Sequence, residues 1–163
     1  MRVVSGGVVL VTLYLVCIGP AATSAQLPDL CSGLKLALTG IPNDFVDFRG
    51  ATRESNADYE VYDSKLTIAG ASDCKISNDT VTGVSFDCVL FKNQQTTLAT
   101  AEYESLKARV SKCPAFESFG RSETPNSGTG RWWTLTGTRE KISVILNAVG
   151  VPQVTVSVAN RFQ

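Results

Sequence analysis

The chain contains 163 residues, with 15 basic and 15 acidic side chains and no histidine. This length supports one domain with a hydrophobic core rather than two. Nucleic acids and anionic membranes are bound through clustered Lys and Arg, and the sequence contains no basic block. The lack of histidine excludes the Ser–His and Cys–His nucleophile arrangements, as well as the usual proton carrier near neutral pH.

Residues 1–25 have the composition of an export signal. Arg2 supplies a positive start, residues 8–18 form an apolar core, and Ala25 ends a run of small residues suited to cleavage. Glycines and a proline interrupt the apolar stretch, which favours cleavage over an uncleaved membrane anchor. We therefore expect a mature domain of residues 26–163, exported to a periplasmic or extracellular location, with no membrane association after cleavage.

The mature chain is expected to begin with a helix over residues 27–38. Leu30, Leu34 and Leu38 share one helical face, and Gly40 ends the helix. Residues 42–48 form a connector whose apolar side chains are expected to be buried: Phe45, Val46 and Phe48. Strand-like segments follow at residues 49–56, which also fit a turn, at residues 58–68, and in a hairpin of residues 74–77 and 84–92.

The most regular segment is residues 96–113, where apolar side chains recur three or four residues apart. They form one stripe along the side of a helix: Ala99, Tyr103, Leu106, Val110 and Cys113. A hydroxyl of Thr96 or Thr97 is expected to cap the first turn, and Pro114 ends the helix because it has no N–H to donate. One helix cannot bury this stripe alone, so strands on either side must cover it.

A flexible loop and three strands are expected after this helix. Residues 121–130 are rich in Ser, Thr, Gly, Asn and Pro, a composition typical of loops. The strands are expected at residues 131–138, 141–146 and 153–159. In the last of them, valines alternate with Thr and Ser, which indicates a strand with one face toward water.

Four cysteines follow the export signal, and an even number in an exported chain predicts two disulfides. Cys74 and Cys88 lie in the expected hairpin, where opposed residues of two antiparallel strands come close enough for a bridge. This pairing leaves Cys31 to bond with Cys113. A zinc site is disfavoured because the chain has no C-x-x-C pair and no histidine.

In order, the elements are a helix, about three strands, a second helix and about three more strands. This order predicts an α+β fold, with two helices packed on one face of an antiparallel sheet of about five to six strands. In element order the chain resembles the secretion-chaperone-like α+β folds. The resemblance rests on no sequence motif and carries no residue assignment.

Trp132 is the candidate for a binding contact. In a strand, Trp132 and Trp133 point to opposite faces, so a buried Trp133 leaves Trp132 partly exposed beside Arg131 and the loop of residues 121–130. An exposed indole beside a guanidinium suits a contact with a partner or ligand. The alternative is that the loop or a helix covers Trp132.

Two further motifs have local explanations. Ser32 and Lys35 spell S-x-x-K, a nucleophile arrangement, but its companion motifs SDN and KTG are missing, and a polar helix face explains the pair. Residues 78–80 form an Asn-Asp-Thr glycosylation sequon within the expected hairpin turn.

These features predict an exported, non-catalytic binding or accessory module, inhibitor-like or chaperone-like. Its partner would be a protein or a small-molecule ligand, with no cofactor, no metal and no nucleic acid. One alternative is a histidine-free hydrolase that uses carboxylates or Ser32 and Lys35. Another is a structural envelope component that assembles through an exposed sheet edge.

Overall fold

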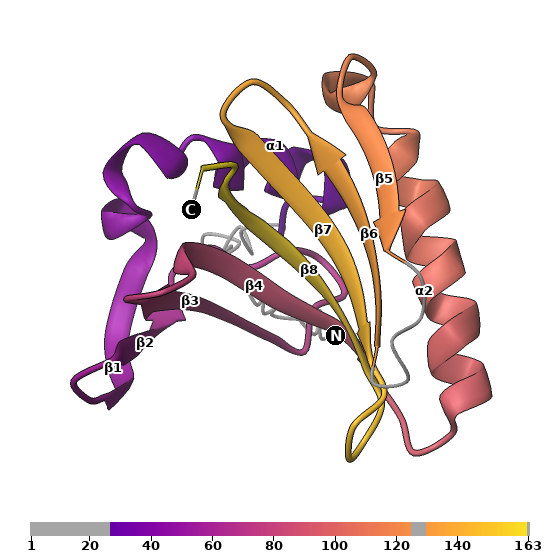
Figure 1. Cartoon of the computed structure of the whole chain (residues 1–163), viewed down its shortest axis with the longest axis horizontal. Helices are drawn as coiled ribbons and strands as arrows, with labels where there is room; N and C mark the ends of the chain where they lie inside the picture. Colours follow the sequence, from indigo (N-terminus) through magenta and orange to yellow (C-terminus); the bar gives the residue numbers. More distant parts are fainter. Residues whose placement is uncertain (1–26, 125–129, 163) are drawn as a thin grey trace, which may run out of the picture.

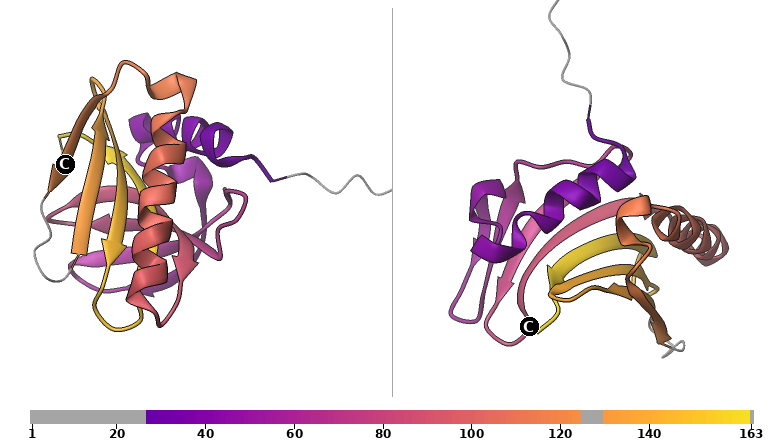
Figure 2. Two further views of the ribbon diagram at one scale, coloured as in Figure 1. Left: turned by 90° about the vertical axis from the view of Figure 1, so that its right-hand side faces the viewer. Right: turned by 90° about the horizontal axis from the view of Figure 1, so that it is seen from above.

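The computed structural model describes residues 27–124 and 130–162 (Figure 1). The expected export signal and residues 125–129 of the expected loop lie outside these ranges. The described chain forms one antiparallel sheet with two α-helices on one of its faces (Figure 2). The α+β class, stabilised by two disulfides, is therefore confirmed.

The sheet has eight strands in the order β1-β2-β3-β4-β8-β7-β6-β5, and all neighbours are antiparallel. The strands are β1 (Arg49–Ser55), β2 (Tyr59–Ser64), β3 (Asp73–Asp79), β4 (Gly83–Lys92), β5 (Gly120–Thr124), β6 (Gly130–Thr136), β7 (Glu140–Asn147) and β8 (Gln153–Asn160). Each set of four consecutive strands forms a meander, and the two meanders join where β4 pairs with β8.

Two α-helices and three short 3-10 helices complete the described fold. They are α1 (Leu30–Leu38), η1 (Ile41–Asn43), η2 (Val46–Phe48), α2 (Thr96–Ser111) and η3 (Pro114–Phe116). Helix α1 begins at Leu30 rather than at residue 27 because Asp29 caps it. The Asp29 carboxylate accepts hydrogen bonds from the backbone N–H groups of Cys31 and Ser32, which have no partner inside the helix.

Alternation along the strands sends apolar side chains to the face that the helices cover. The largest buried set comes from the central strands: Ile76, Val84, Phe86, Cys88, Leu135, Ile142, Val144, Leu146, Val154, Val156 and Val158. The predicted stripe of α2 packs on the same core, and Ala99, Tyr103, Leu106 and Val110 have no exposed surface. Burying a large apolar side chain stabilises the fold by about 1.5–3 kcal/mol, so this stripe is a major attachment of α2 to the sheet.

The sheet has eight strands instead of the expected five to six. The loop expected at residues 121–130 is wrong in its first part, because residues 120–124 form β5 and pair with β6. Residues 49–55 form β1 at the opposite edge. Most side chains of both edge strands are exposed, so neither strand carries the apolar alternation that marks a half-buried strand.

Two local expectations are also wrong. Helix α2 follows Gln95, and no side chain caps its first turn, because Thr96 and Thr97 already lie inside the helix. Asn93 orders the entry instead, accepting a hydrogen bond from the Gln95 backbone N–H. In the connector, Phe45 has a φ of 58° and turns into the core against Phe86, while Val46 is left 54 % exposed rather than buried.

The two disulfides have the predicted pairing. Cys31 of α1 is bonded to Cys113, which follows α2, across 82 residues of sequence. Cys74 and Cys88 are direct cross-strand partners in β3 and β4. Two formed disulfides indicate an oxidising environment. Within residues 27–124 and 130–162, no helix combines the length and the apolar character needed to cross a membrane.

Candidate functional site

The structure places Arg131 and Trp132 on opposite faces of β6. Trp133 is 7 % exposed and belongs to the core, so Arg131 shares the helix-covered face with it. Trp132 is half-buried on the other face, which neither α1 nor α2 covers. The two candidate residues therefore do not form one contact surface.

Arg131 belongs to a charged cluster between α2 and the strands β5 and β6. Its guanidinium lies 2.9 Å from Glu104 Oε1, 3.0 Å from Glu123 Oε1 and 4.8 Å from the centre of the Tyr103 ring. Lys107 Nζ lies 3.1 Å from Glu104 Oε2 and 2.8 Å from Glu123 Oε2. We call these five residues the Tyr103 cluster. Because each charge in it has an opposite partner, the cluster fastens α2 to the sheet.

Hydrogen bonds and burial shift the pKa values of Glu123 and Tyr103 in the Tyr103 cluster. The hydrogen bond from Lys107 lowers the pKa of Glu123, which therefore stays ionised. Burial, reinforced by the charge of Glu123, raises the pKa of Tyr103, whose neutral hydroxyl donates a hydrogen bond to Glu123 Oε1 at 3.2 Å. Glu123 and Tyr103 therefore keep the same protonation states through the neutral range, and their contacts hold α2 against β5 and β6.

The other two sequence motifs also serve local structure. The Ser32 hydroxyl donates a hydrogen bond to Asp29 Oδ2 at 2.9 Å, so it binds the capping carboxylate of α1. Lys35 lies on the exposed side of that helix. Asn78 is at the end of β3, where its side-chain amide donates to Glu60 Oε2 at 3.3 Å, and Thr80 of the sequon is exposed in the following turn.

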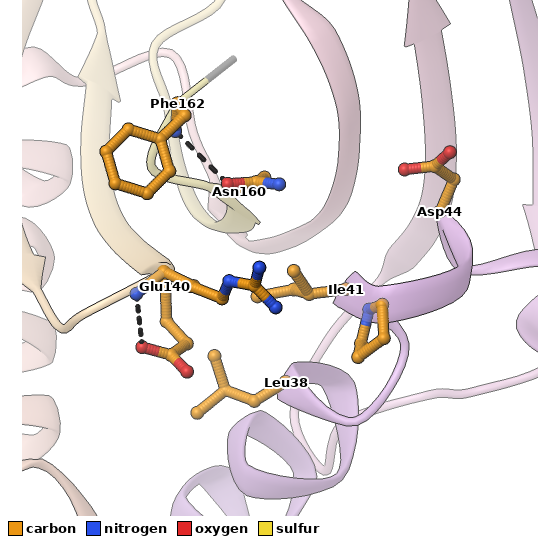
Figure 3. Close-up of a pocket in the computed structure, with 8 residues that line it drawn as sticks. Leu38, Ile41, Asp44, Glu140, Asn160 and Phe162 are labelled. Atoms are coloured by element: carbon orange, nitrogen blue, oxygen red, sulfur yellow. Dashed lines mark hydrogen bonds between the residues drawn. The ribbon is translucent and has the colours of Figure 1, made fainter.

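One cleft lies at the end of the sheet beside the last turn of α1 (Figure 3). This end cleft has a volume of about 360 Å³ and is lined by Leu38, Ile41, Pro42, Asp44, Arg139, Glu140, Asn160 and Phe162. Figure 3 shows Phe162 and Asn160 on one side, with Asp44 and Ile41 across from them. Asn160 and Glu140 already accept hydrogen bonds from backbone N–H groups of Phe162 and Arg139. Two of the polar side chains that line the end cleft are thus already hydrogen-bonded within the protein.

A second hollow lies on the face of the sheet opposite the helices. This open-face groove has a volume of about 310 Å³ and crosses the four adjacent strands β3, β4, β8 and β7. It is lined by Asp73, Lys75, Asp87, Val89, Ile145, Asn147, Gln153 and Thr155. These residues alternate along each strand with buried core residues, so all eight side chains leave the sheet away from the helices.

The strand register extends this groove toward Trp132. One row of successive cross-strand partners runs Asp73, Val89, Thr155, Ile145 and Trp132. The indole of Trp132 leans over Gly130, because a Cβ placed on Gly130 would lie 3.1 Å from Trp132 Cη2. Gly130 itself pairs with Asn147, and Asn147 pairs with Gln153. Trp132 is therefore one strand beyond the groove and beside its amide side chains.

Charges in the groove are nearly balanced. Arg53 of β1 donates two hydrogen bonds to the Asp73 carboxylate, at 2.6 and 2.9 Å, and these bonds lower the pKa of Asp73. Asp87 accepts a hydrogen bond from the Ser85 hydroxyl at 2.8 Å, and Lys75 supplies a positive charge beside both carboxylates. In the part of the chain that the structure describes, the side chains of Lys75, Gln153 and Thr155 have no hydrogen bond or ion pair.

The sequence pointed to Trp132 and to a wet face on residues 153–159, but not to the groove. Its residues come from four strands that are distant in sequence, and only the pairing of β4 with β8 brings them together. Within residues 27–124 and 130–162, no group of three or more Cys, Asp or Glu side chains is placed to hold a metal ion.

The fold and the groove define a small disulfide-bonded α+β protein with one polar sheet face that no described helix covers. In comparisons with known proteins, no family model, curated protein or solved structure matches the chain.

Proposed function

We propose that this protein is a non-catalytic binding module, exported to the periplasm or the cell exterior, that holds a neutral polar ligand in the open-face groove. The observation that carries the proposal is a hollow on the sheet face opposite the helices, where the side chains of Lys75, Gln153 and Thr155 make no hydrogen bond or ion pair with the described residues. A ligand bound in the groove can form hydrogen bonds with these groups in place of the bonds that they form with water.

The charges of the groove favour a neutral ligand. An anion would meet two carboxylates, Asp73 and Asp87, and a cation would meet Lys75, while Arg53 is already engaged by Asp73. Like charges about 4 Å apart near a protein surface repel by about 4 kcal/mol, which is large against the few kcal/mol of a modest affinity. An uncharged ligand with several donors and acceptors avoids this cost.

A non-catalytic role is supported by the protonation of the groove. The lowered pKa of Asp73, caused by the hydrogen bonds from Arg53, keeps that carboxylate ionised and unable to act as a general acid near neutral pH. The groove also lies over central strands that the Cys74–Cys88 disulfide joins, so its side chains stand on a rigid support.

A thermal-shift screen tests this proposal. The mature protein is screened against a panel of sugars, amino acids, short peptides and nucleosides, and a ligand of the folded state raises Tm in a concentration-dependent way. Thr155→Arg, which fills the groove, should abolish the shift, and Thr97→Arg on the exposed side of α2 should keep it. A shift that survives Thr155→Arg would place the ligand elsewhere and contradict the proposal.

A further inference from the structure

We infer that the ligand of the open-face groove is a carbohydrate chain that crosses the strands and stacks one sugar ring on Trp132. This inference deepens the proposed function and rests on it. Three observations carry this inference. Trp132 is an aromatic side chain in register with the groove, the groove surface beside it is both apolar and polar, and the row of cross-strand partners from Asp73 to Trp132 is long.

The six-membered ring of Trp132 leans over Gly130 rather than standing away from the sheet. The residue is half-buried, so part of the indole surface remains open to solvent on the uncovered face. One face of a pyranose ring is lined by C–H groups, and such a surface packs on the electron-rich face of an aromatic ring. The missing side chain at Gly130 is what allows the indole to adopt this position.

The surface beside Trp132 has both apolar and hydrogen-bonding groups, as a sugar does. Val89 and Ile145 are half-buried apolar residues in the same row as Trp132, suited to C–H groups. Gln153 carries a planar amide that both donates and accepts, and Thr155 carries a hydroxyl. The amide oxygen of Asn147 already accepts a hydrogen bond from the Val149 N–H, which leaves the Asn147 amide N–H groups to donate, and the Asp87 carboxylate accepts. Sugar hydroxyls likewise donate and accept, so they match this set without a net charge.

The row sets the size of the ligand. From β3 to Trp132 on β6 there are four strand spacings of about 4.8 Å, roughly 19 Å in all. This span exceeds a single sugar ring and fits a short linear oligosaccharide. The neighbouring row does not extend this surface, because Ser143 is 8 % exposed and its hydroxyl lies 3.2 Å from that of Thr134.

The experiment is a titration of the mature protein with neutral tetrasaccharides. Cellotetraose, chitotetraose, maltotetraose and mannotetraose are the probes, read by tryptophan fluorescence and by calorimetry. At least one should bind. Trp132→Ala should weaken that binding by about tenfold or more, and Trp132→Phe should restore part of it, because a ring remains.

Two matched pairs locate the site. Gln153→Ala should weaken binding, whereas Gln95→Ala, at an exposed position before α2, should not. Phe162→Ala removes an exposed aromatic of the end cleft and should leave the affinity unchanged. A saccharide whose affinity falls with Phe162→Ala but not with Trp132→Ala would overturn the assignment to the groove.

The failure of this inference is distinguishable from failure of the proposed function. If no tetrasaccharide binds, while another compound gives a thermal shift that Thr155→Arg abolishes, the carbohydrate is wrong and the binding module stands. If no saccharide binds and no compound gives a shift that depends on the groove, both are wrong.

Discussion

Gly130 shows how one residue controls the candidate site. A Cβ at this position would lie 2.6 Å from the Leu146 carbonyl oxygen and 3.1 Å from the Trp132 ring. The first contact is with backbone, which cannot move without disturbing the pairing of β6 with β7. The absence of a side chain therefore allows both the close strand approach and the position of the indole.

Gly130→Ala is expected to destabilise the fold by about 1–3 kcal/mol, because overpacking against backbone forces a local shift. Gly120→Ala is the matched control in the neighbouring strand β5, where the nearest atom to a new Cβ is 3.7 Å away. Urea unfolding followed by circular dichroism measures both. Equal effects of the two substitutions would contradict this account of Gly130.

Glu123 makes the stability of the folded protein depend on pH. Its pKa is lowered in the folded state, chiefly by the hydrogen bond from Lys107. The stabilisation is therefore complete above the ordinary value of 4.5 and is lost as pH falls through the lower folded-state pKa. Because Glu123 is partly exposed, solvent screening keeps this contribution modest.

Glu123→Gln should lower the urea midpoint at pH 7, and the difference in midpoint from the unchanged protein should narrow at pH 3, below the ordinary Glu pKa of 4.5. Glu117→Gln, on an exposed residue after α2, serves as the control and should show no such narrowing. A gap of the same size at both pH values would mean that the charge of Glu123 contributes nothing.

Of the two disulfides, one joins the two α-helices and the other joins two strands. Cys31–Cys113 ties α1 to the end of α2, and Cys74–Cys88 ties β3 to β4 beneath the open-face groove. Cys74 lies between Asp73 and Lys75 on its strand, so the second bridge fixes the spacing of groove residues on two strands.

Replacing both cysteines of a bridge by Ala should cost more stability for Cys31–Cys113 than for Cys74–Cys88. Loop-closure entropy gives about 4.5 kcal/mol for a separation of 82 residues and about 3 kcal/mol for one of 14. Ligand affinity should follow the opposite order, because only Cys74–Cys88 supports the groove. Denaturant unfolding of the two double variants measures the order of stability, and a ligand titration of each measures the order of affinity.

A larger loss of stability without Cys74–Cys88 would contradict the loop-entropy account. An affinity lost only without Cys31–Cys113 would show that Cys74–Cys88 does not support the groove.

For the whole molecule, the pairing of β4 with β8 joins the two meanders into one sheet. Val156 and Val158 of β8 lie opposite Cys88 and Phe86 of β4, and all four are buried in the single core. Each meander thus contributes to a core that the other completes, and neither half has a separate buried cluster among the described residues.

We therefore expect one cooperative unfolding transition. Circular dichroism and the fluorescence of Trp132 and Trp133 on β6 should give coincident urea curves, although the tryptophans report only the second meander. Val156→Ala should shift both curves together. Separate midpoints for the two probes would show that the meanders unfold independently.

The sequence by itself determined the elements whose pattern is local. The stripe of α2, the hairpin with its opposed cysteines, and the alternation in β8 could be predicted because helices and half-buried strands impose fixed spacings on apolar residues. The tertiary structure alone decided β5 and the groove, and it decided between a strand and a turn for residues 49–55. Strands β1 and β5 form because a neighbouring strand supplies backbone hydrogen bonds, and their own residues show no apolar alternation. The groove forms because β4 pairs with β8, and the spacing of apolar residues does not specify which strands become neighbours.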